Sequence, residues 1–361
     1  MSAQQKNFFF ELTGIRAIAA YMVFFHHNNM FSEKKFGWFI HNFINELHVG
    51  VTIFFVLSGF LICHRYYDNI ELHKKKWIFI YIKNRVARIY PMYFLMTTIT
   101  FIFIFKNSVD IKNDIIIYIM NITFLRGFFQ SIAFTGIAQG WTLTVEECFY
   151  ISAPFLFAAS KKIKLIIPFL LIFFSGTLLV LIFRKIDFHG FFADYKFMLS
   201  YTFFGRCFEF FIGVSLALYL KRKTKFNKAN SSFYTNLGSI WITLCIASFV
   251  LIKEDEKFGV FRYEGILINN LVLPIGIAML FLGLVTERSW FGRILSSRLF
   301  VLLGKSSYIF YLIHMSLVSL FINEFFNNTI ILFILLNLLS IVMFKYLEEP
   351  MNKYIRNLKF G

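Results

Sequence analysis

The sequence predicts an all-α fold, a polytopic membrane bundle of about ten transmembrane helices with a re-entrant or interfacial segment near residues 115-129. The first reason is composition, because 58% of the 361 residues are hydrophobic, 16% are charged and the mean hydropathy is +0.65. A soluble core of this size cannot bury so much apolar surface. The second reason is that apolar stretches of about 20 residues, enough for one crossing, recur throughout the chain. No Pro/Gly/Ser-rich linker divides them, so we expect residues 1-361 to form a single membrane domain.

Eleven segments are long and apolar enough to be considered as crossings. In chain order they are residues 9-27, 47-64, 89-105, 115-129, 141-160, 165-183, 197-220, 237-252, 266-286, 299-321 and 329-347. The first contains Glu11 and Arg16 and lacks a small-residue cleavage site, so we expect a retained helix instead of a cleavable signal.

The distribution of Lys and Arg decides which of the eleven segments does not cross. If 115-129 stays on one side, the loops on the side of the amino terminus hold 22 Lys and Arg, and the opposite loops hold 11. If 115-129 crosses, the counts become 14 and 18, against the rule that cytoplasmic loops carry the excess. We therefore expect ten crossings with both termini cytoplasmic. The same rule accounts for the net charge of +17 without a nucleic-acid partner.

The first helix carries two ionisable residues on one face. Arg16 and His27 are eleven residues apart, which separates them by about 20° around the helix and roughly 16 Å along it. His26 points about 80° away from Arg16, so His27 is the better candidate for chemistry beside Arg16. Ionisable groups within membrane helices are costly and are therefore candidates for function. The alternative is a histidine at a helix end that contacts lipid headgroups.

The second helix and the basic loop after it predict packing and anion binding, respectively. Ser58 and Gly59 are small enough to allow close approach of another helix. The loop ends with Arg85 and Arg88, which lie on one helical face because they are three residues apart. Two guanidinium groups in this arrangement suit a phosphate or pyrophosphate. Determination of topology, or contact with lipid headgroups, is the alternative.

Segment 141-160 begins with two adjacent carboxyl groups, Glu146 and Glu147, in an otherwise apolar helix. Thr142, Glu146 and Tyr150 share one face of this helix. In the ten-crossing topology Glu146 and His27 both lie in the outer half of the membrane. A histidine with a carboxylate nearby is the usual arrangement for a general base. An unreactive buried ion pair is the alternative.

Two later helices also contain polar residues at helical spacing. Arg206 and Glu209 are an i,i+3 pair, for which we prefer an internal salt bridge that stabilises the bundle. Ser307, Tyr311 and His314 share one face of segment 299-321. Tyr311 and His314 could line a substrate path or form hydrogen bonds between helices.

The cysteines give no sign of a disulfide framework or a metal site. Four are present, each alone within or beside an apolar run: Cys63, Cys148, Cys207 and Cys245. None has the spacing of a zinc ligand set, so neither disulfides nor structural zinc are expected and no metal is predicted.

Taken together, these segments resemble the acyltransferase-3 family of bacterial integral-membrane O-acyltransferases, from Leu12 to Pro350. The matching patterns are Arg16 and His27 as Arg-x10-His, Gly50 to Ile62 as Phe-Phe-x-Leu-Ser-Gly-Phe, Arg85 and Arg88 as Arg-x-x-Arg, Trp141 to Tyr150 with Thr142 in place of Ser, Gly205 to Gly213, and Gly304 to His314. Family members often have Asp-Gly before the first Arg and Gly after it, whereas this chain has Thr13-Gly14 and Ala17. We expect no carboxy-terminal hydrolase-like domain of the kind found in some relatives.

The resemblance implies transfer of an acetyl or other acyl group from cytoplasmic acetyl-CoA to a hydroxyl of a cell-envelope glycan. The acceptor classes are lipopolysaccharide O-antigen, capsule, exopolysaccharide and lipid-linked sugar, and the implied location is the bacterial inner (plasma) membrane. Under this hypothesis His27 and Glu146 are catalytic, and Arg16, Arg85 and Arg88 bind the phosphates of acetyl-CoA. A substrate path or structural support is assigned to a further group: Trp141, Thr142, Tyr150, Arg206, Glu209, Tyr311 and His314.

A transporter or flippase of a lipid-linked glycan is the alternative function. Such a protein also uses a helical bundle with buried Arg, His and Glu, although the paired broken helices and repeats typical of transporters are not evident in the sequence. The sequence leaves the oligomeric state open. It also leaves open whether acyl transfer is direct or passes through an acyl-histidine intermediate.

Overall fold

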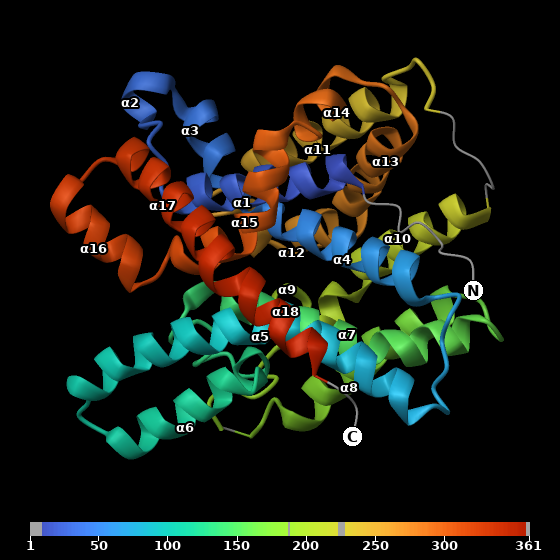
Figure 1. The fold of residues 1–361 in the computed structure, drawn as a ribbon. Coiled ribbons are helices and arrows are strands. Elements are labelled where there is room, and N and C mark those ends of the chain that lie inside the picture. The colour runs from blue at the N-terminus through green and yellow to red at the C-terminus, as the bar shows by residue number, and fades with distance from the viewer. Residues whose placement is uncertain (1–8, 187, 223–227, 359–361) are drawn as a thin grey trace.

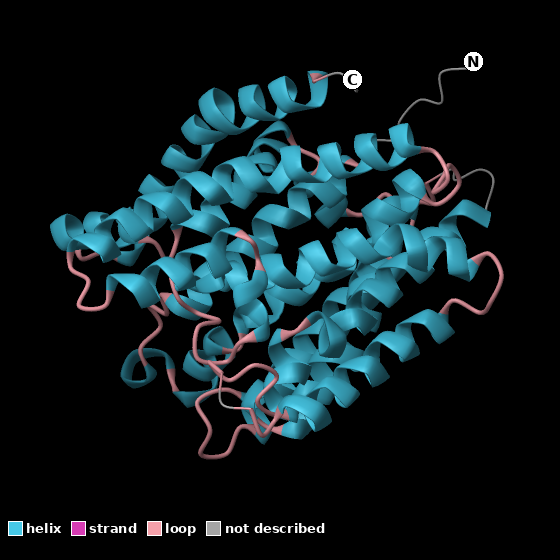
Figure 2. Cartoon of the chain, turned by 90° about the horizontal axis from the view of Figure 1, so that it is seen from below, coloured by secondary structure: helices cyan, strands magenta, loops and turns pink. Residues whose placement is uncertain are grey.

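The computed structural model describes residues 9–186, 188–222 and 228–358 as a bundle of helices (Figures 1 and 2). The first helices are α1 (Phe10–His27), α2 (Glu33–Phe36), α3 (Trp38–Asn45), η1 (Leu47–Val49), α4 (Gly50–Tyr66), α5 (Lys75–Lys106), α6 (Ile111–Ile122), η2 (Leu125–Phe128), η3 (Ala138–Gly140), α7 (Trp141–Ser160) and α8 (Ile166–Phe183). The later helices are α9 (Tyr195–Tyr201), α10 (Phe203–Arg222), α11 (Phe233–Ile252), η4 (Gly259–Phe261), α12 (Tyr263–Leu267), η5 (Ile268–Val272), α13 (Leu273–Thr286), α14 (Trp290–Leu295), α15 (Arg298–Ile313), α16 (Leu317–Phe326), α17 (Thr329–Met343), η6 (Phe344–Glu348) and α18 (Glu349–Asn357).

The described residues contain no strand, only two isolated bridges between single residues. The prediction of an all-α polytopic bundle is therefore confirmed. Lys6, Lys223, Lys225 and Lys359, which contribute to the predicted charge asymmetry, lie outside the described residues.

Seven described helical segments are long and apolar enough to cross a membrane. They are Trp38–Tyr66, Lys75–Lys106, Ile166–Phe183, Tyr195–Arg222, Phe233–Ile252, Tyr263–Thr286 and Thr329–Asn357. The pair α15 and α16, bent by 87°, makes eight if it is a single broken span. This number is smaller than the predicted ten. The two long helices outside this set, α1 and α7, are the ones that contain Arg16 and Glu146.

The α5–α6 hairpin contains the first part of segment 115-129, for which no crossing is predicted. Helix α6 has 12 residues, about 18 Å of helix, which is too short to span a hydrocarbon core of about 30 Å. After α6 the chain pairs with the loop that follows α8, because the backbone N–H of Gln130 donates to Gly190 and that of Ser131 donates to His189. The connection between α5 and α7, residues 111–140, therefore passes beside the loop that follows α8.

The centre of the bundle is built on close contact between α4 and α10 and between α1 and α15 (Figure 1). Glycines permit this approach. A Cβ at Gly59 would lie 2.4 Å from the carbonyl oxygen of Phe210, and one at Gly213 would lie 2.0 Å from that of Val56. The two helices thus cross at two glycines, and the packing role predicted for Gly59 agrees with this geometry.

Helix α5 and the predicted segment 299-321 show the clearest differences between predicted and observed ranges. Helix α5 starts at Lys75, well before the predicted 89, and this extension packs against α18, where Asn352 Nδ2 donates to the carbonyl of Ala87 at 2.8 Å. The predicted uninterrupted helix 299-321 is wrong, because α15 ends at Ile313 and Ser316 caps a new helix by accepting the N–H of Val318.

Candidate active site

A large cavity, here the central cavity, lies among α1, α4, α5, α7, α15 and the η6–α18 segment, with a volume of about 1920 Å³. Along α4 its wall extends from Arg65 to Val51, which is fourteen residues and about 21 Å of helix. This length is roughly two thirds of a hydrocarbon core about 30 Å thick. Seven of the predicted site residues line it: Arg16, Arg85, Arg88, Thr142, Glu146, Tyr150 and Tyr311.

The cavity wall carries an excess of positive charge, with nine Lys or Arg and five Asp or Glu. Salt bridges pair Glu11 with Lys228, Asp68 with Lys221, Glu348 with Arg88, and Glu349 with Lys353. Within the described ranges these pairs leave five lining cations without a carboxylate partner: Arg16, Arg65, Arg85, Lys305 and Arg356. A cavity of this charge is suited to an anionic ligand.

The two arginines of the basic loop lie on the extended part of α5 and have different partners. Arg85 lies over the rings of Tyr66 and Tyr150, 5.5 Å and 5.4 Å from their centroids, and its Nη2 donates to the Tyr66 hydroxyl at 3.3 Å. Arg88 Nη1 binds the buried carboxylate of Glu348 at 2.9 Å. Arg85 is therefore held by aromatic faces that leave its charge available to an anion, whereas Arg88 is already paired.

Glu146 lies on the wall of the central cavity and binds two hydroxyl groups. Ser58 Oγ donates to its Oε1 at 2.5 Å, and the Tyr150 hydroxyl donates to the same oxygen. The packing role predicted for Ser58 is thus incomplete, because this side chain points into the cavity and positions a carboxylate. Arg16 lines the same cavity, and its buried Nε has no hydrogen-bond partner among the described residues.

The deep end of the cavity is closed by Thr142 and Tyr311, whose hydroxyl oxygens are 3.1 Å apart. Thr142 Oγ1 also contacts the Gln139 carbonyl at 2.8 Å, and the Gln139 amide donates to the carbonyls of Tyr311 and Leu312 at 2.6 Å and 2.9 Å. These bonds join the start of α7 to the end of α15. The cavity therefore ends at a group of hydrogen bonds between the start of α7 and the end of α15, here called the polar seam.

His27 lies beyond this seam and does not line the central cavity. Its ring is 5.6 Å from the ring of His314, which is in turn 5.4 Å from the ring of Tyr311. His314 Nδ1–H donates to the Tyr311 carbonyl at 2.7 Å, so its Nε2 carries the free lone pair. No contact in the described structure joins His27 to Glu146. The two residues predicted as a catalytic pair are thus on opposite sides of Tyr311 and His314.

Arg206 and Glu209 form a buried bidentate salt bridge, with both N–O distances 2.7 Å. Arg206 Nη2 also donates to Thr52 Oγ1 at 3.2 Å, and its guanidinium lies 5.9 Å from the centroid of Trp141. Neither member of the pair nor Trp141 lines the cavity. The geometry supports a structural role, in which α10 is fixed to α4 and α7.

Sequence reasoning did not single out several residues that the structure places at these sites. Three charged residues that line the cavity are Arg65, Glu348 and Arg356. In the sequence they resemble ordinary flanking charges of membrane helices. Glu348 directly follows a predicted crossing, which was the available signal. Arg126 is fully buried, donates to Asn121 Oδ1 at 2.7 Å, and holds the loop between α6 and α7.

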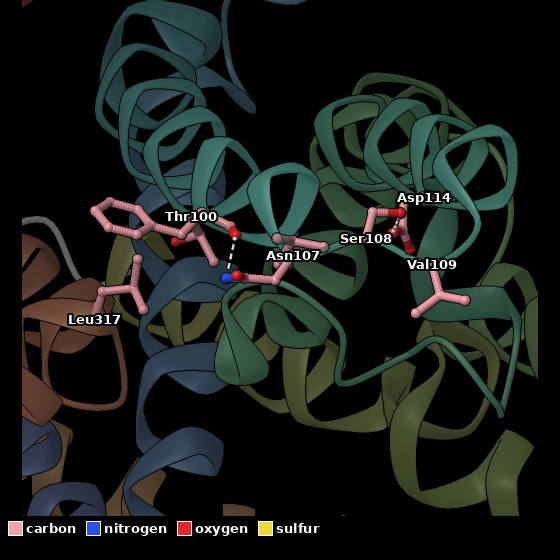
Figure 3. Close-up of a pocket in the computed structure, with 8 residues that line it drawn as sticks. Thr100, Asn107, Ser108, Val109, Asp114 and Leu317 are labelled. Atoms are coloured by element: carbon pink, nitrogen blue, oxygen red, sulfur yellow. Dashed lines mark hydrogen bonds between the residues drawn. The ribbon is translucent and has the colours of Figure 1, made fainter.

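A second, smaller cavity of about 440 Å³ lies between the end of α5, the α5–α6 turn and the start of α16 (Figure 3). Asn107 and Leu317 face it, and Ser108 Oγ donates to Asp114 Oδ2 at 2.6 Å on its other side. None of the predicted site residues lines it. The described residues also contain no group of three or more potential ligands that could hold a metal ion.

The fold and the polar cavity define a helical protein with several apolar spans and a deep cavity that carries an excess of positive charge. The family described as "Acyltransferase domain", acyltransferase-3, matches residues 9–344 of the chain. The chain therefore belongs to the acyltransferase-3 family.

The curated relatives carry related names. A Staphylococcus aureus (strain COL) protein, provisionally named an O-acetyltransferase, is 25% identical over 372 residues, which cover 95% of this chain and 57% of the relative. A Bacillus subtilis (strain 168) protein, provisionally named a peptidoglycan O-acetyltransferase, is 25% identical over 94% of this chain and 54% of its own length. An Acidianus two-tailed virus protein, provisionally named an acetyltransferase, is 25% identical over 87% and 84%. The chain thus spans little more than half the length of the two bacterial relatives. No solved structure matches it.

Proposed function

We propose that this protein is an O-acetyltransferase that takes an acetyl group from cytoplasmic acetyl-CoA and transfers it to a hydroxyl of a cell-envelope glycan. The observation that carries the proposal is the central cavity, which holds unpaired cations and extends about 21 Å along α4. CoA combines a pyrophosphate and a 3′-phosphate with a long thioester arm. Its phosphates therefore suit the unpaired cations of the cavity, and its arm suits the length of the cavity along α4. The printed names of the bacterial relatives support acetyl as the group and a glycan as the acceptor.

Arg16 and Arg85 are assigned to the phosphates of the donor, whereas Arg88, which the sequence placed with them, is paired with Glu348. Arg85 is the stronger of these two assignments, because its guanidinium lies over aromatic rings and has no carboxylate partner in the described structure. Arg16 has a free buried Nε on the same wall. Glu146 lies at this donor side, so we assign it to positioning the donor and not to orienting His27.

His27 is proposed as the general base at the outer end of α1. It takes the proton of the acceptor hydroxyl while the hydroxyl oxygen forms a C–O bond to the acetyl carbonyl carbon. The C–S bond then breaks, and the CoA thiolate takes a proton from the imidazolium, so that atoms and charge balance. Thr142 and Tyr311, at the end of the cavity, are the groups that the thioester meets first. Direct transfer of this kind leaves no acyl group on the enzyme.

The proposal includes the arrangement in the membrane. The seven apolar segments, the bent pair α15 and α16, and the polar helices α1 and α7 together give ten crossings of the bacterial plasma membrane. Residues placed on the cytoplasmic side contact one another, as Glu11 contacts Lys228, and so do residues placed outside, as Lys253 contacts Asn42. Both termini are then cytoplasmic, and the chain forms one membrane domain.

The test uses the purified chain in lipid vesicles with [¹⁴C]acetyl-CoA on one side and solubilised envelope glycan on the other. We expect base-labile label on the glycan and one CoA thiol released for each acetyl group transferred. Release of thiol without labelled glycan would indicate the wrong acceptor. Movement of glycan across the vesicle membrane with no thiol release would overturn the proposal in favour of a transporter.

A further inference from the structure

A carboxylate other than Glu146 lies beside the histidines at the outer end of α1. Glu46, in the turn between α3 and η1, is fully buried and accepts the backbone N–H of Gly259 at 2.8 Å through Oε1. Its other oxygen, Oε2, has no hydrogen-bond partner among the described residues. Burying a carboxylate oxygen without a hydrogen-bond partner costs free energy, so the groups around Oε2 indicate the role of this carboxylate.

The nearest ionisable group to the free oxygen is His48, whose Nδ1 is 3.5 Å from Glu46 Oε2. Neither ring nitrogen of His48 has a hydrogen-bond partner in the described part of the chain. No Lys or Arg among the described residues forms a salt bridge with Glu46. The ionisable group in direct contact with this carboxylate is therefore an imidazole.

The same turn encloses His26, the neighbour of His27. The ring of His48 is 5.6 Å from that of His26, and the ring of His26 is 4.5 Å from that of His27. His26 Nδ1–H also donates to the backbone carbonyl of Asn45. Residues 45 to 48 thus contact His26 through the main-chain oxygen of Asn45 and the ring of His48. The same turn contains the carboxylate of Glu46.

We propose that Glu46 is a positioning residue for acyl transfer, acting through His48 and His26 on His27. The proposal rests on the proposed function, in which His27 becomes positively charged when it takes the acceptor proton. A buried negative charge that lacks a Lys or Arg partner stabilises that positive charge and holds His48 in one orientation. Glu146, whose described partners are Ser58 and Tyr150, has no comparable path to His27.

The first variant is Glu46→Gln, which keeps an oxygen for the Gly259 N–H and removes the charge. With acetyl-CoA and solubilised envelope glycan as substrates, we expect kcat to fall while the KM for acetyl-CoA stays unchanged. The fall should be about tenfold or more, but smaller than the about 10⁴-fold seen when a carboxylate in direct contact with a catalytic histidine is neutralised. A wild-type kcat in a folded Glu46→Gln protein would overturn the inference.

A matched control is Glu287→Gln, because Glu287 is also a buried carboxylate that accepts backbone N–H groups, here from Tyr234 and Thr235 at the other end of the bundle. It should lose thermal stability without a change in kcat. If both variants lose only stability, Glu46 has a purely structural role and the inference is wrong.

The second test is a double-mutant cycle with His48→Phe, which keeps a ring beside His26 and Phe249 but cannot hydrogen-bond to Glu46. If Glu46 acts through His48, Glu46→Gln should cause little further loss of kcat in the His48→Phe background. Multiplicative losses would contradict the proposed path. Inactivity of the wild-type protein in this assay would instead refute acyl transfer itself, so the two failures are distinguishable.

Discussion

At the scale of single residues, the histidine pair at the end of α1 gives the most direct test of the chemistry. His27→Ala should lower acetyl transfer by about 10²–10⁴-fold, the usual cost of removing a general base. His26→Ala keeps the base and removes only a neighbouring ring and its bond to Asn45, so it should lose far less activity. Both variants should accumulate in the membrane at wild-type levels, as measured by quantitative immunoblot. A larger loss in His26→Ala would contradict the assignment of His27.

The two arginines of α5 should separate into a binding role and a structural one. Arg85→Ala should raise the KM for acetyl-CoA with little effect on unfolding temperature, because its partners are the neutral rings of Tyr66 and Tyr150. Arg88→Ala leaves the buried carboxylate of Glu348 unpaired and should destabilise the fold by about 3–5 kcal/mol.

The controls for this comparison are one conservative substitution and one double variant. Arg85→Lys should recover only part of the donor affinity, since a lysine cannot form two parallel hydrogen bonds to a phosphate. Adding Glu348→Gln to Arg88→Ala should restore much of the lost stability, because it removes the uncompensated charge. Unchanged acetyl-CoA affinity in Arg85→Ala would leave only the topological role for that residue. Donor affinity is measured by titration calorimetry and stability by thermal unfolding in detergent.

Glu287 predicts a pH-dependent contribution to stability. Burial alone raises the pKa of this carboxyl group, but hydrogen bonds from the N–H groups of Thr235 and Tyr234 and from the hydroxyls of Thr235 and Ser231 outweigh it and lower the pKa below its usual value. A lowered folded-state pKa gives stability that is complete above the unfolded pKa of about 4.3 and is lost as the pH falls through the folded value.

The measurement is the unfolding free energy of wild type and Glu287→Gln between pH 7 and pH 3. The variant should be less stable at pH 7 by about 1–3 kcal/mol, since its neutral amide replaces a carboxylate that accepts charge-assisted bonds. The difference should shrink below about pH 4, where the wild-type group takes up its proton. A difference that stays constant over this range would show that the charge contributes nothing.

The residues of the site were only partly predictable from the sequence. Spacing along one helix placed Thr142, Glu146 and Tyr150 on one face, and in the structure all three line the central cavity. Spacing within a helix says nothing about which helix stands opposite. The sequence therefore could not show that Tyr311 and His314 separate Glu146 from His27.

At the scale of helices, the predicted ranges agree best where hydrophobicity alone sets the ends. Segment 141-160 matches α7 (Trp141–Ser160), and 165-183 nearly matches α8 (Ile166–Phe183). The early start of α5 was not predictable, because its apolar run at residues 77–82 is short and lies between clusters of Lys and Arg, and because α18 from the far end of the chain packs against it. The break after α15 was missed because His314, Met315 and Ser316 do not form a strong break signal.

The α5–α6 hairpin allows a test of topology. Single cysteines at Lys112 and Ser131, in a background without the four native cysteines, should both react with an impermeant thiol reagent from the outside. Both positions are exposed in the structure, whereas Gln139 is buried and would not report. Cysteine at Lys162 should be protected until the membrane is permeabilised, since the proposed arrangement puts the basic loop after α7 on the cytoplasmic side. Labelling of Lys162 together with Lys112 from the outside would sink the ten-crossing arrangement.

At the scale of the whole molecule, one interior connects two different regions. The central cavity is lined by cationic side chains of α4, α5 and α18, and at Thr142 and Tyr311 it meets the helices α7 and α15, where the ring of Tyr311 lies beside that of His314. The overall class, a polytopic helical bundle, followed from composition, because apolar content depends on no particular contact. The cavity itself did not, since its wall combines side chains from many separate parts of the chain.

The depth of the central cavity also has an electrical consequence. If water and ions fill the central cavity of the proposed transferase, the membrane voltage falls mainly across the layer between the cavity and the outside, where Tyr311, His314 and His27 lie. In the proposed reaction the acetyl group moves outward without charge, while a proton moves inward from the acceptor hydroxyl to the CoA thiolate. Each turnover then carries one elementary charge through most of the field, worth about 2.3 kcal/mol per 100 mV. An interior-negative potassium diffusion potential in vesicles should accelerate transfer, and the opposite potential should slow it.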